Sequence, residues 1–312
     1  MSPDRPGAGG TIPLRARDRT IELGGRPLLM GIVNASPDSF SDGGRHRTTA
    51  ERLALARELL DAGADILDVG GESATTGRPP VDAGEEIARV VPLIEAIAAQ
   101  TGGEALISID TYKPTVASAA VAAGAHIVND VSGLRDPALA DVCVQTGAAL
   151  VVMHTAAPPR VRRQEPDLYG DVVRDVTAFL RERIDVATAA GVALEQIVVD
   201  PGPDFAKTPA QTIELLAGVQ RLHALGRPLL LAISRKDFIG ALTRRPPRER
   251  LAGTLAALGH GLRAGAHIFR VHDVAAAADF LTVHAALGGE LPPERTLTLA
   301  EELRHEPRRR VL

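Results

Sequence analysis

The chain has 312 residues, 45% of them hydrophobic, with 35 basic against 39 acidic side chains. This balance lacks the basic excess of nucleic-acid-binding proteins, and no apolar run reaches the roughly 18 residues needed to cross a bilayer. The segment from Met1 to Thr20 has no hydrophobic stretch of the kind that signal peptides carry. The single cysteine, Cys143, excludes an internal disulfide and fits a reducing compartment. We therefore expect a cytoplasmic protein that binds neither nucleic acid nor membrane.

One short pattern recurs along the chain: a glycine between small residues, then an aliphatic run, then polar residues. It occurs around Gly63, Gly124, Gly147 and Gly265. Glycine directly after a helix adopts the left-handed conformation that ends helices at low cost. A helix that stops and leads at once into a buried strand, several times over, indicates βα units around a parallel sheet.

Eight candidate strands alternate with helices along about 260 residues. The predicted strands are 28–34, 66–70, 106–110, 126–129, 149–154, 197–200, 229–234 and 268–272. The predicted helices are one that begins after Thr48-Thr49 and others at 85–99, 114–123, 136–146, 172–190, 209–225, 248–264 and 275–287. This count predicts an α/β fold, a single-domain (β/α)₈ TIM barrel over residues 21–288. A doubly wound open sheet is the alternative, disfavoured because no G-x-G-x-x-G follows the first strand.

The two ends of the chain have a different character from the barrel segment. Residues 1–20 mix Pro, Gly, Arg and Asp, and we expect them to form a flexible N-terminal segment. Residues 289–312 carry Pro292-Pro293 and Arg308-Arg309-Arg310, which predicts a charged, solvated tail with one short helix.

Polar side chains collect where the predicted strands end. They are Asn34, Asp68, Asp110, Asn129, His154, Asp200, Ser234 with Lys236, and Arg270 with His272. A polar residue at one strand end can simply cap the next helix, but this explanation is weak for nearly all eight ends at once. In barrels of this type the carboxyl-terminal rim carries the chemistry.

Part of this set suits a flat polar heterocycle with several ring nitrogens. Asp110, Asn129, Asp200 and Lys236 are hydrogen-bonding groups, and a carboxylate can accept two donors of such a ring as a pair. The pattern predicts a binding site for a nitrogen heterocycle at the rim.

Another part suits an anion. Arg270 and His272, two residues apart, point to the same side of the last strand, and Asn34 lies on the neighbouring first strand if the barrel closes. A phosphate or pyrophosphate with Mg²⁺ is a natural occupant of such a site. A structural ion pair of Arg270 with Asp273 is the alternative.

Seven motifs at these positions resemble those of the dihydropteroate synthase family. They are 30–44 (MGIVNASPDSFSDGG), 68–73 (DVGGES), 108–111 (SIDT), 129–133 (NDVSG), 200–202 (DPG) with Phe205 and Lys207, 234–236 (SRK) and 270–273 (RVHD). The resemblance runs from about Leu28 to Leu287.

The resemblance implies a TIM barrel that joins 6-hydroxymethyl-7,8-dihydropterin pyrophosphate to p-aminobenzoate. The products are 7,8-dihydropteroate and pyrophosphate, in folate biosynthesis, with Mg²⁺ as cofactor. Sulfonamides compete for the p-aminobenzoate site in this family, and its members are commonly homodimers.

Matched motif by motif, the resemblance implies a role for each site residue. The pterin contacts would be Asp110, Asn129, Asp200 and Lys236, with Met153 and Phe205 lining the pocket. The Mg²⁺ and pyrophosphate contacts would be Asn34, Arg270 and His272. Ser234 would meet the p-aminobenzoate carboxylate and Arg235 would shape that subsite. The first loops, with Pro37, Asp38 and Phe40, would close over the second substrate.

The second motif departs from the family pattern, which continues Gly-Glu-Ser-Thr-Arg-Pro-Gly. Here Ala74 and Thr75 occupy the places of the Thr and Arg that touch pyrophosphate. Either Arg78 supplies the cation, with Thr75 or Thr76 giving a hydroxyl, or this loop binds something else. Asp204 also stands where a glycine is usual before Phe205.

Two other functions are compatible with parts of the sequence. A methyltetrahydrofolate:corrinoid methyltransferase shares the first motif and the pterin-holding residues, but does not need the Ser-Arg-Lys and Arg-Val-His motifs. A catalytically silent pterin-binding paralogue is the other alternative, because of the altered second loop. His126 and His267, at strand starts, are expected to be structural, whereas His154 could line the pocket.

Overall fold

A computed structural model describes residues 11–35, 48–73, 80–290, 294 and 296–304. The chain divides into two compact units, residues 1–278 and 279–312, and the boundary lies inside the last long helix. In the described part of the chain, none of the helices combines the length and the apolar character of a membrane span.

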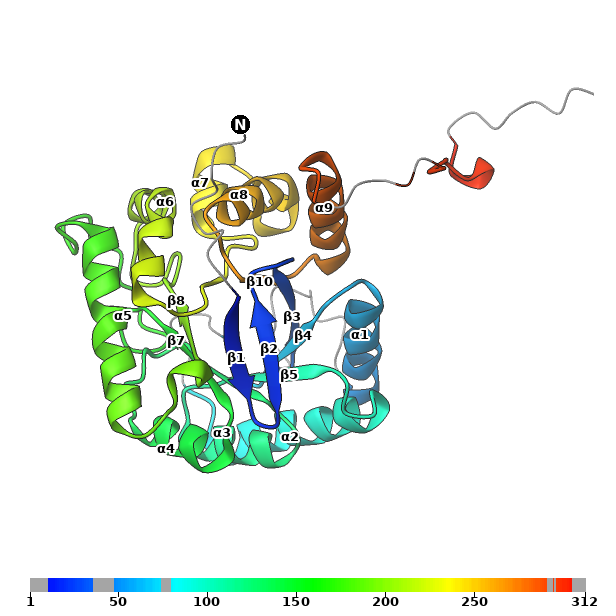
Figure 1. Ribbon diagram of the computed structural model, residues 1–312. Coiled ribbons are helices and arrows are strands. Elements are labelled where there is room, and N and C mark those ends of the chain that lie inside the picture. Colours follow the sequence, from blue (N-terminus) through cyan, green and yellow to red (C-terminus); the bar gives the residue numbers. More distant parts are fainter. Residues whose placement is uncertain (1–10, 36–47, 74–79, 291–293, 295, 305–312) are drawn as a thin grey trace, which may run out of the picture. The chain divides into compact units, whose positions relative to one another are not determined.

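The first unit is built on eight parallel strands that form a barrel (Figure 1). They are β3 (Leu28–Asn34), β4 (Ile66–Gly70), β5 (Leu106–Asp110), β6 (Ile127–Asp130), β7 (Ala149–Met153), β8 (Ile197–Asp200), β9 (Leu230–Leu231) and β10 (Ile268–Val271). Neighbouring strands follow the order β8-β7-β6-β5-β4-β3-β10-β9, and a single parallel bridge between Val199 and Leu229 joins the two ends. The predicted TIM barrel is confirmed.

The strands lie where the sequence predicts them because most are buried on both faces. β4 and β7 are buried along their whole length, as expected of strands covered by helices. The predicted glycines are left-handed, with φ of +98° at Gly63 and +122° at Gly124. Only β9 is much shorter than its predicted range, 229–234, because the chain leaves the sheet towards a turn after Leu231.

Helices surround the barrel strands (Figure 1). They are α1 (Thr49–Asp61), α2 (Ala83–Gln100), α3 (Pro114–Ala122), α4 (Ala138–Thr146), α5 (Val172–Ala189), α6 (Pro209–Ala217), α7 (Asp237–Thr243) and α8 (Leu251–Arg263). Thr48 begins α1 with a capping box to Glu51, as the Thr-Thr signal predicts. The helix predicted over 209–225 is instead two, α6 and the 3₁₀ helix η2 (Val219–Leu225), which meet at Gly218. The short helix α7 was not predicted.

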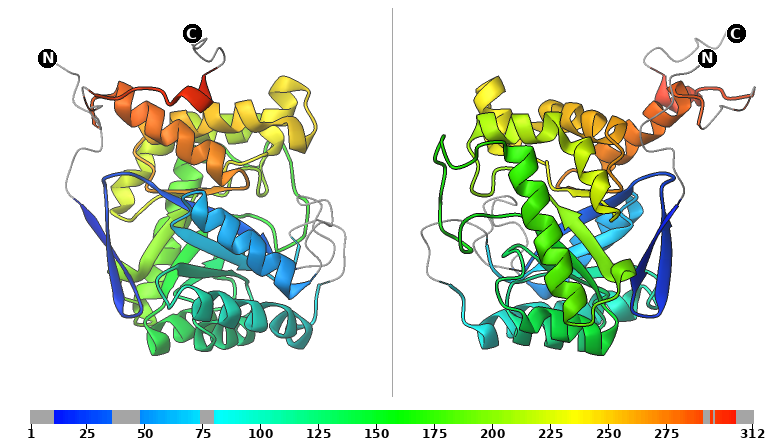
Figure 2. Two further views of the ribbon diagram at one scale, coloured as in Figure 1. Left: turned by 90° about the vertical axis from the view of Figure 1, so that its right-hand side faces the viewer. Right: turned by 60° about the vertical axis from the view of Figure 1, so that its left-hand side comes forward.

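An antiparallel hairpin, β1 (Ile12–Ala16) and β2 (Arg19–Leu23), precedes the barrel. It replaces the flexible segment expected there, so that expectation is wrong for residues 12–20. Leu14, Ala16 and Leu23 are buried in one cluster with residues from the starts of the barrel strands. Figure 2 shows the hairpin along one end of the barrel. It closes the end opposite the rim.

Arginine side chains fasten the hairpin to the barrel. Arg17 donates to the carbonyl oxygens of Val121 and Ala125, at 3.1 and 3.2 Å, and its backbone N–H donates to Gly147 at 2.7 Å. These acceptors are carbonyls of the helix-to-strand turns, which lie at the closed end of the barrel.

The second unit contains the C-terminal part of α9 (Val274–Leu287) and the 3₁₀ helix η4 (Glu301–Leu303). The short helix expected in the C-terminal tail corresponds to η4.

Candidate active site

The predicted site residues lie at the carboxyl ends of the barrel strands. Asn34 ends β3, Asp110 ends β5, Met153 ends β7 and Asp200 ends β8. The sheet register pairs Asp110 with Asn129 on β6, and Met153 with Asp200. The closure of the barrel pairs β10 with β3, as expected, and places Arg270 opposite Met30. Residues far apart in the chain therefore share one rim.

Arg270 stands between two carboxylates. Its Nε donates to Asp68 Oδ2 at 2.6 Å and its Nη2 donates to Asp110 Oδ2 at 2.9 Å. Asn129 Nδ2 also donates to Asp68 Oδ2, at 3.2 Å. Burial lowers the pKa of Arg270, but the two carboxylates outweigh burial and raise it. The alternative of an Arg270–Asp273 pair is wrong, because Asp273 pairs with Arg235 instead.

Two carboxyl groups of the rim have raised pKa values. Burial, opposed by Arg270, raises the pKa of Asp110 to about 7. Burial raises the pKa of Asp200 to about 6, although its Oδ1 accepts a hydrogen bond from the Gly202 N–H at 2.8 Å. Perturbed carboxyl groups in a cleft are typical of functional sites.

The turn between β9 and α7 carries Ser234, Arg235 and Lys236. Lys236 Nζ lies 4.4 Å from the centre of the Phe205 ring, a cation–π contact. Burial lowers the pKa of Lys236. Arg235 pairs with Asp273 through two nitrogens, Nη2 at 2.6 Å and Nε at 3.1 Å.

Ser234 and His272 form a hydrogen-bonded pair beside this turn. The His272 backbone N–H donates to Ser234 Oγ at 3.2 Å, and Oγ lies 3.0 Å from His272 Nδ1. Burial, aided by nearby cations, lowers the pKa of His272 to about 3. The imidazole is neutral at pH 7, and if the hydroxyl donates to Nδ1, the Nε2–H remains as a donor.

Lys207 is a residue of the β8–α6 loop, and its side chain is fully buried. Its Nζ lies 2.9 Å from three acceptors: the carbonyl oxygens of Gly202 and Phe205, and His154 Nδ1. Burial lowers the pKa of Lys207 to about 7, and burial with the nearby Lys207 lowers that of His154 to about 2. His154 is only 3% exposed and faces Lys207, so it supports this loop.

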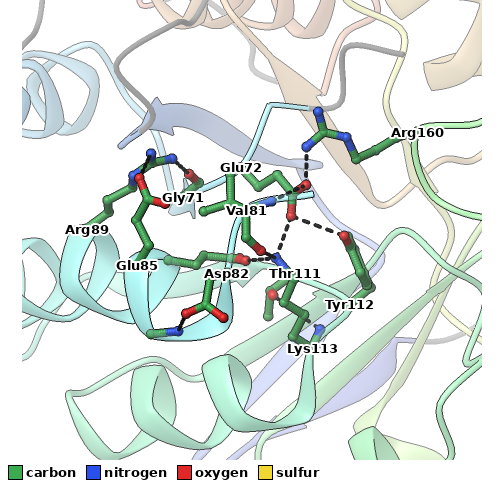
Figure 3. Close-up of polar contacts among 12 residues, drawn as sticks. Gly71, Glu72, Val81, Asp82, Glu85, Arg89, Thr111, Tyr112, Lys113 and Arg160 are labelled. Carbon is green, nitrogen blue, oxygen red and sulfur yellow. Dashed lines mark hydrogen bonds and ion pairs between the residues drawn. The ribbon is translucent and has the colours of Figure 1, made fainter. Parts of the chain in front are cut away.

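A buried polar cluster lies beside these groups, around Glu72 (Figure 3). The Glu72 carboxylate accepts from Lys113 Nζ at 2.6 Å, from Tyr112 Oη at 3.2 Å and from Arg160 Nη1. Lys113 also donates to Glu86, which is 1% exposed. Burial raises the pKa of Glu72, but the hydrogen bonds from Lys113 and Arg160 outweigh burial and lower it. Loops after β4, β5 and β7 thus meet at one carboxylate.

Two cavities open on either side of Arg235. The first has a volume of about 340 Å³ and is lined by Asp110, Phe205, Arg235 and Lys236, together with Glu72 and Arg160 of the polar cluster. The second, of about 550 Å³, is lined by Ser234, Arg235, His272 and the segment 246–249. The rim can therefore hold a ring system and a separate anionic group.

Sequence reasoning missed several residues that shape these cavities. Glu72 and Lys207 lie inside recognised motifs, and their charge within apolar surroundings could have identified them. Arg160 lies on the long loop after β7, where no motif or spacing pointed to it. The predicted residues Pro37, Asp38, Phe40, Thr75 and Arg78 lie outside the described residues.

Comparison with known proteins identifies the family. The sequence profile described as "Pterin binding enzyme" matches residues 30–272. The dihydropteroate synthase of Escherichia coli K12 is 38% identical over 295 residues, which cover 95% of this chain and 100% of that protein.

Solved structures of dihydropteroate synthases resemble this chain in both sequence and fold. The Xanthomonas albilineans dihydropteroate synthase with 4-aminobenzoic acid is 44% identical, with a TM-score of 0.80, covering 88% of this chain and 98% of that one. The Burkholderia cenocepacia enzyme complexed with 7,8-dihydropteroate is 40% identical, also with a TM-score of 0.80, covering 89% and 97%. The chain belongs to the dihydropteroate synthase family of pterin-binding enzymes.

Proposed function

We propose that this chain condenses 6-hydroxymethyl-7,8-dihydropterin pyrophosphate with p-aminobenzoate, giving 7,8-dihydropteroate and pyrophosphate. The observation that carries the proposal is the arrangement of Asp110, Asn129 and Asp200 at the carboxyl ends of β5, β6 and β8, with the contact of Lys236 and Phe205 at the same rim. The homologous enzymes with bound 4-aminobenzoic acid or 7,8-dihydropteroate support the assignment of both substrates.

The pterin ring is proposed to bind between Asp200 and Asp110, with Asn129 and Lys236 at its edge and Met153 beneath it. A pterin carries several N–H donors and ring acceptors, and carboxylates accept such donors in pairs. Phe205 offers an apolar surface, and Lys236 above its ring supplies a cation for a pterin acceptor. This division of donors and acceptors selects a heterocycle by its hydrogen-bond pattern.

The pyrophosphate is proposed to bind to Arg270 and His272, with Asn34 nearby. Arg270 donates to two carboxylates, and a diphosphate would compete with them for its guanidinium. The neutral His272 would offer its Nε2–H. Arg78 and Thr75 are proposed to supply the contacts that the family obtains from Thr and Arg.

Mg²⁺ fits this arrangement as an ion carried largely by substrate. Among the described residues no group of three His, Cys, Asp or Glu side chains could hold a metal. Mg²⁺ prefers oxygen ligands and often keeps several waters while bound to substrate phosphates, so one amide oxygen from Asn34 is an adequate protein ligand. When bound, Mg²⁺ neutralises charge on the diphosphate leaving group.

The chain's own residues would then orient the reactants and stabilise charge. Departure of pyrophosphate leaves positive charge on the methylene conjugated to the pterin, and ionised Asp110 and Asp200 face the ring to stabilise it. The arylamine of p-aminobenzoate needs placement more than activation. Its carboxylate is proposed to replace His272 Nδ1 as the acceptor of the Ser234 hydroxyl proton, with Arg235 shaping the subsite. Pro37, Asp38 and Phe40 are proposed to close over the second substrate and exclude water.

Release of pyrophosphate from the pterin substrate tests this function. The synthase predicts release that requires both p-aminobenzoate and Mg²⁺. A silent paralogue predicts no release, and a corrinoid methyltransferase predicts none without its corrinoid partner. Rescue of a bacterium that lacks its own synthase, grown without folate end-products, provides an independent test.

The altered second loop has its own test. Arg78→Ala should weaken binding of the pterin pyrophosphate much more than binding of p-aminobenzoate, because only the former carries the diphosphate. Equal effects on the two substrates would contradict the role proposed for Arg78.

We also propose that the protein is a homodimer that acts in the cytoplasm. The buried state of its single cysteine, Cys143, is compatible with a reducing compartment. Size-exclusion chromatography with light scattering tests the dimer.

A further inference from the structure

The turn after β9 has a backbone conformation that its residues do not favour by themselves. Arg235 has φ of +58°, in the left-handed region that residues other than glycine rarely adopt. Lys236, the residue before α7, has an extended conformation, and its side chain makes no capping hydrogen bond. Residues in such conformations persist only where their surroundings hold them.

Arg250 provides much of this support from the start of α8. Its Nη1 donates to the carbonyl oxygens of Arg235 at 2.9 Å and Lys236 at 3.1 Å, and to Asp237 Oδ1 at 3.1 Å. Its Nε donates to the carbonyl oxygen of Arg245 at 2.9 Å. The side chain is only 11% exposed. One planar guanidinium thus binds the outer side of the whole turn.

Gly240 makes room for this guanidinium. A Cβ atom at Gly240 would lie 2.2 Å from Arg250 Nη2 and 2.4 Å from Cζ, closer than any real contact. The absence of a side chain on α7 is therefore what allows Arg250 to reach the two carbonyls. The contact of Arg250 with the turn therefore depends on the glycine at position 240.

The same turn presents its side chains to the cavities. Lys236 contacts Phe205, and Arg235 pairs with Asp273. On the outer side, Thr254 Oγ1 accepts the Arg235 N–H at 3.0 Å, next to the Arg250 contacts. A change at Arg250 would release two carbonyls at once and let Arg235 relax, which would move Lys236 relative to Phe205.

We propose that Arg250 is a positioning residue for the reaction: it holds the Ser234–Lys236 turn, through Gly240, so that Lys236 and Arg235 face their substrates. This inference rests on the proposed function, and it concerns residues that do not touch substrate themselves. The alternative is that Arg250 only joins α7 to α8 and contributes to stability.

The test compares variants of the full chain. Arg250→Met removes the donors, Arg250→Lys keeps one charge, and Gly240→Ala blocks the guanidinium. Arg245→Ala is the matched control, because the Arg245 side chain is exposed and, among the described residues, pairs with Glu249, whereas its backbone carbonyl is kept. Steady-state kinetics give kcat and KM for both substrates, calorimetry gives the Kd of the pterin pyrophosphate, and thermal unfolding gives Tm.

We expect Arg250→Met to lower kcat/KM for the pterin pyrophosphate at least tenfold, and Arg250→Lys to restore part of the loss. Gly240→Ala should give a similar loss, and the double variant should lose no more than the worse single variant, since both disrupt one contact. Arg245→Ala should stay within twofold of the wild type.

Three results would overturn the proposal. One is a lowered Tm with kcat/KM unchanged within twofold, which shows a purely structural role. Another is independent, multiplicative losses from Gly240→Ala and Arg250→Met. A third is unchanged pterin pyrophosphate affinity and kcat in Gly240→Ala, the variant to use if Arg250→Met does not fold. If the wild type itself releases no pyrophosphate, the proposed function fails, and the calorimetric Kd still reports on Arg250.

Discussion

Lys207 offers a direct test of the electrostatics beneath the site. It is one of three lysines in the chain, is fully buried, and has a pKa lowered to about 7 by burial. An unfolded chain returns this lysine to an ordinary pKa of about 10.4. Between these two values the unfolded state binds one more proton than the folded state, so the free energy of unfolding rises with pH.

The size of the effect follows from the linkage relation. Each pH unit in this window is worth about 1.4 kcal/mol for one proton, so the interval from pH 7 to pH 9.5 corresponds to about 3 kcal/mol. Lys207→Met removes the titrating group. The free energy of unfolding of the wild type minus that of Lys207→Met should therefore increase by about 3 kcal/mol over this interval.

Lys113→Met is the matched control. Lys113 is held by Glu72 and Glu86, which outweigh the effect of burial and raise its pKa. Lys113 is then protonated in both the folded and the unfolded chain up to pH 9.5. The difference in free energy of unfolding between the wild type and Lys113→Met should therefore not change over the interval. Urea unfolding followed by circular dichroism at pH 7, 8, 9 and 9.5 gives both differences. A flat difference for Lys207→Met would show that the buried amine stays charged, which refutes the reasoning.

Three further predictions concern pH and the hairpin. Burial raises the pKa values of Asp110 and Asp200 to about 7 and 6, and both are proposed to accept pterin donors as carboxylates. The calorimetric affinity for the pterin substrate should therefore fall as pH drops from 8 to 5.5, and Asp200→Asn should weaken binding at pH 8 by about 1.5–3 kcal/mol. Burial and two arginines lower the pKa of His126 to about 4, below its unfolded value, so its neutral form stabilises the fold above pH 6.5. This contribution of His126 to the free energy of unfolding should be lost as pH falls from 6.5 to 4, by about 1–3 kcal/mol. Urea unfolding at pH 7 and pH 4.5 should therefore show a smaller loss of stability for His126→Asn than for the wild type. Arg17→Ala should lower stability by about 1–3 kcal/mol in the same assay, yet leave kcat unchanged because the hairpin lies at the end of the barrel away from the rim.

The barrel was predictable because its signals are local. A strand buried on both faces leaves an unbroken aliphatic run, and the glycine before it marks the end of the preceding helix. These signals do not depend on what the strand packs against, which is why β3, β4, β5 and β8 have the predicted bounds.

The hairpin was not predicted although its alternation is visible in the sequence. Leu14 and Ala16 alternate with Arg15 and Arg17, as in a strand with one buried face. The arginines made the segment look solvated. Arg15 donates to the Gln196 side chain, 181 residues away, and Arg17 to backbone carbonyls 104 and 108 residues away; only the closed barrel brings these acceptors to the hairpin.

The sequence predicted which charged and polar residues lie at the strand ends, but it did not predict how these residues pair. The sequence offers Asp273, three residues away, only as an alternative partner of Arg270, and the structure pairs Arg270 with Asp68, which is 202 residues away in sequence. The closed barrel brings Arg270 to the carboxylates of the rim, and Asp273 pairs with Arg235 instead. Sequence reasoning can name charged residues at strand ends, whereas their partners depend on the geometry of the whole ring.

The pairing at Arg270 has a consequence for how the pterin substrate is recognised. Arg270 donates to Asp68 and to Asp110, so under the proposed function the substrate competes with these ion pairs for both the guanidinium and the Asp110 carboxylate. A diphosphate that draws Arg270 away leaves Asp110 in need of a new donor, because an unpaired buried carboxylate is costly. The N–H groups of a pterin are such donors. Under the proposed function, a molecule that carries both the ring and the diphosphate offers new partners to Asp110 and to Arg270 at once, whereas a diphosphate alone draws Arg270 from Asp110 and offers that carboxylate no donor.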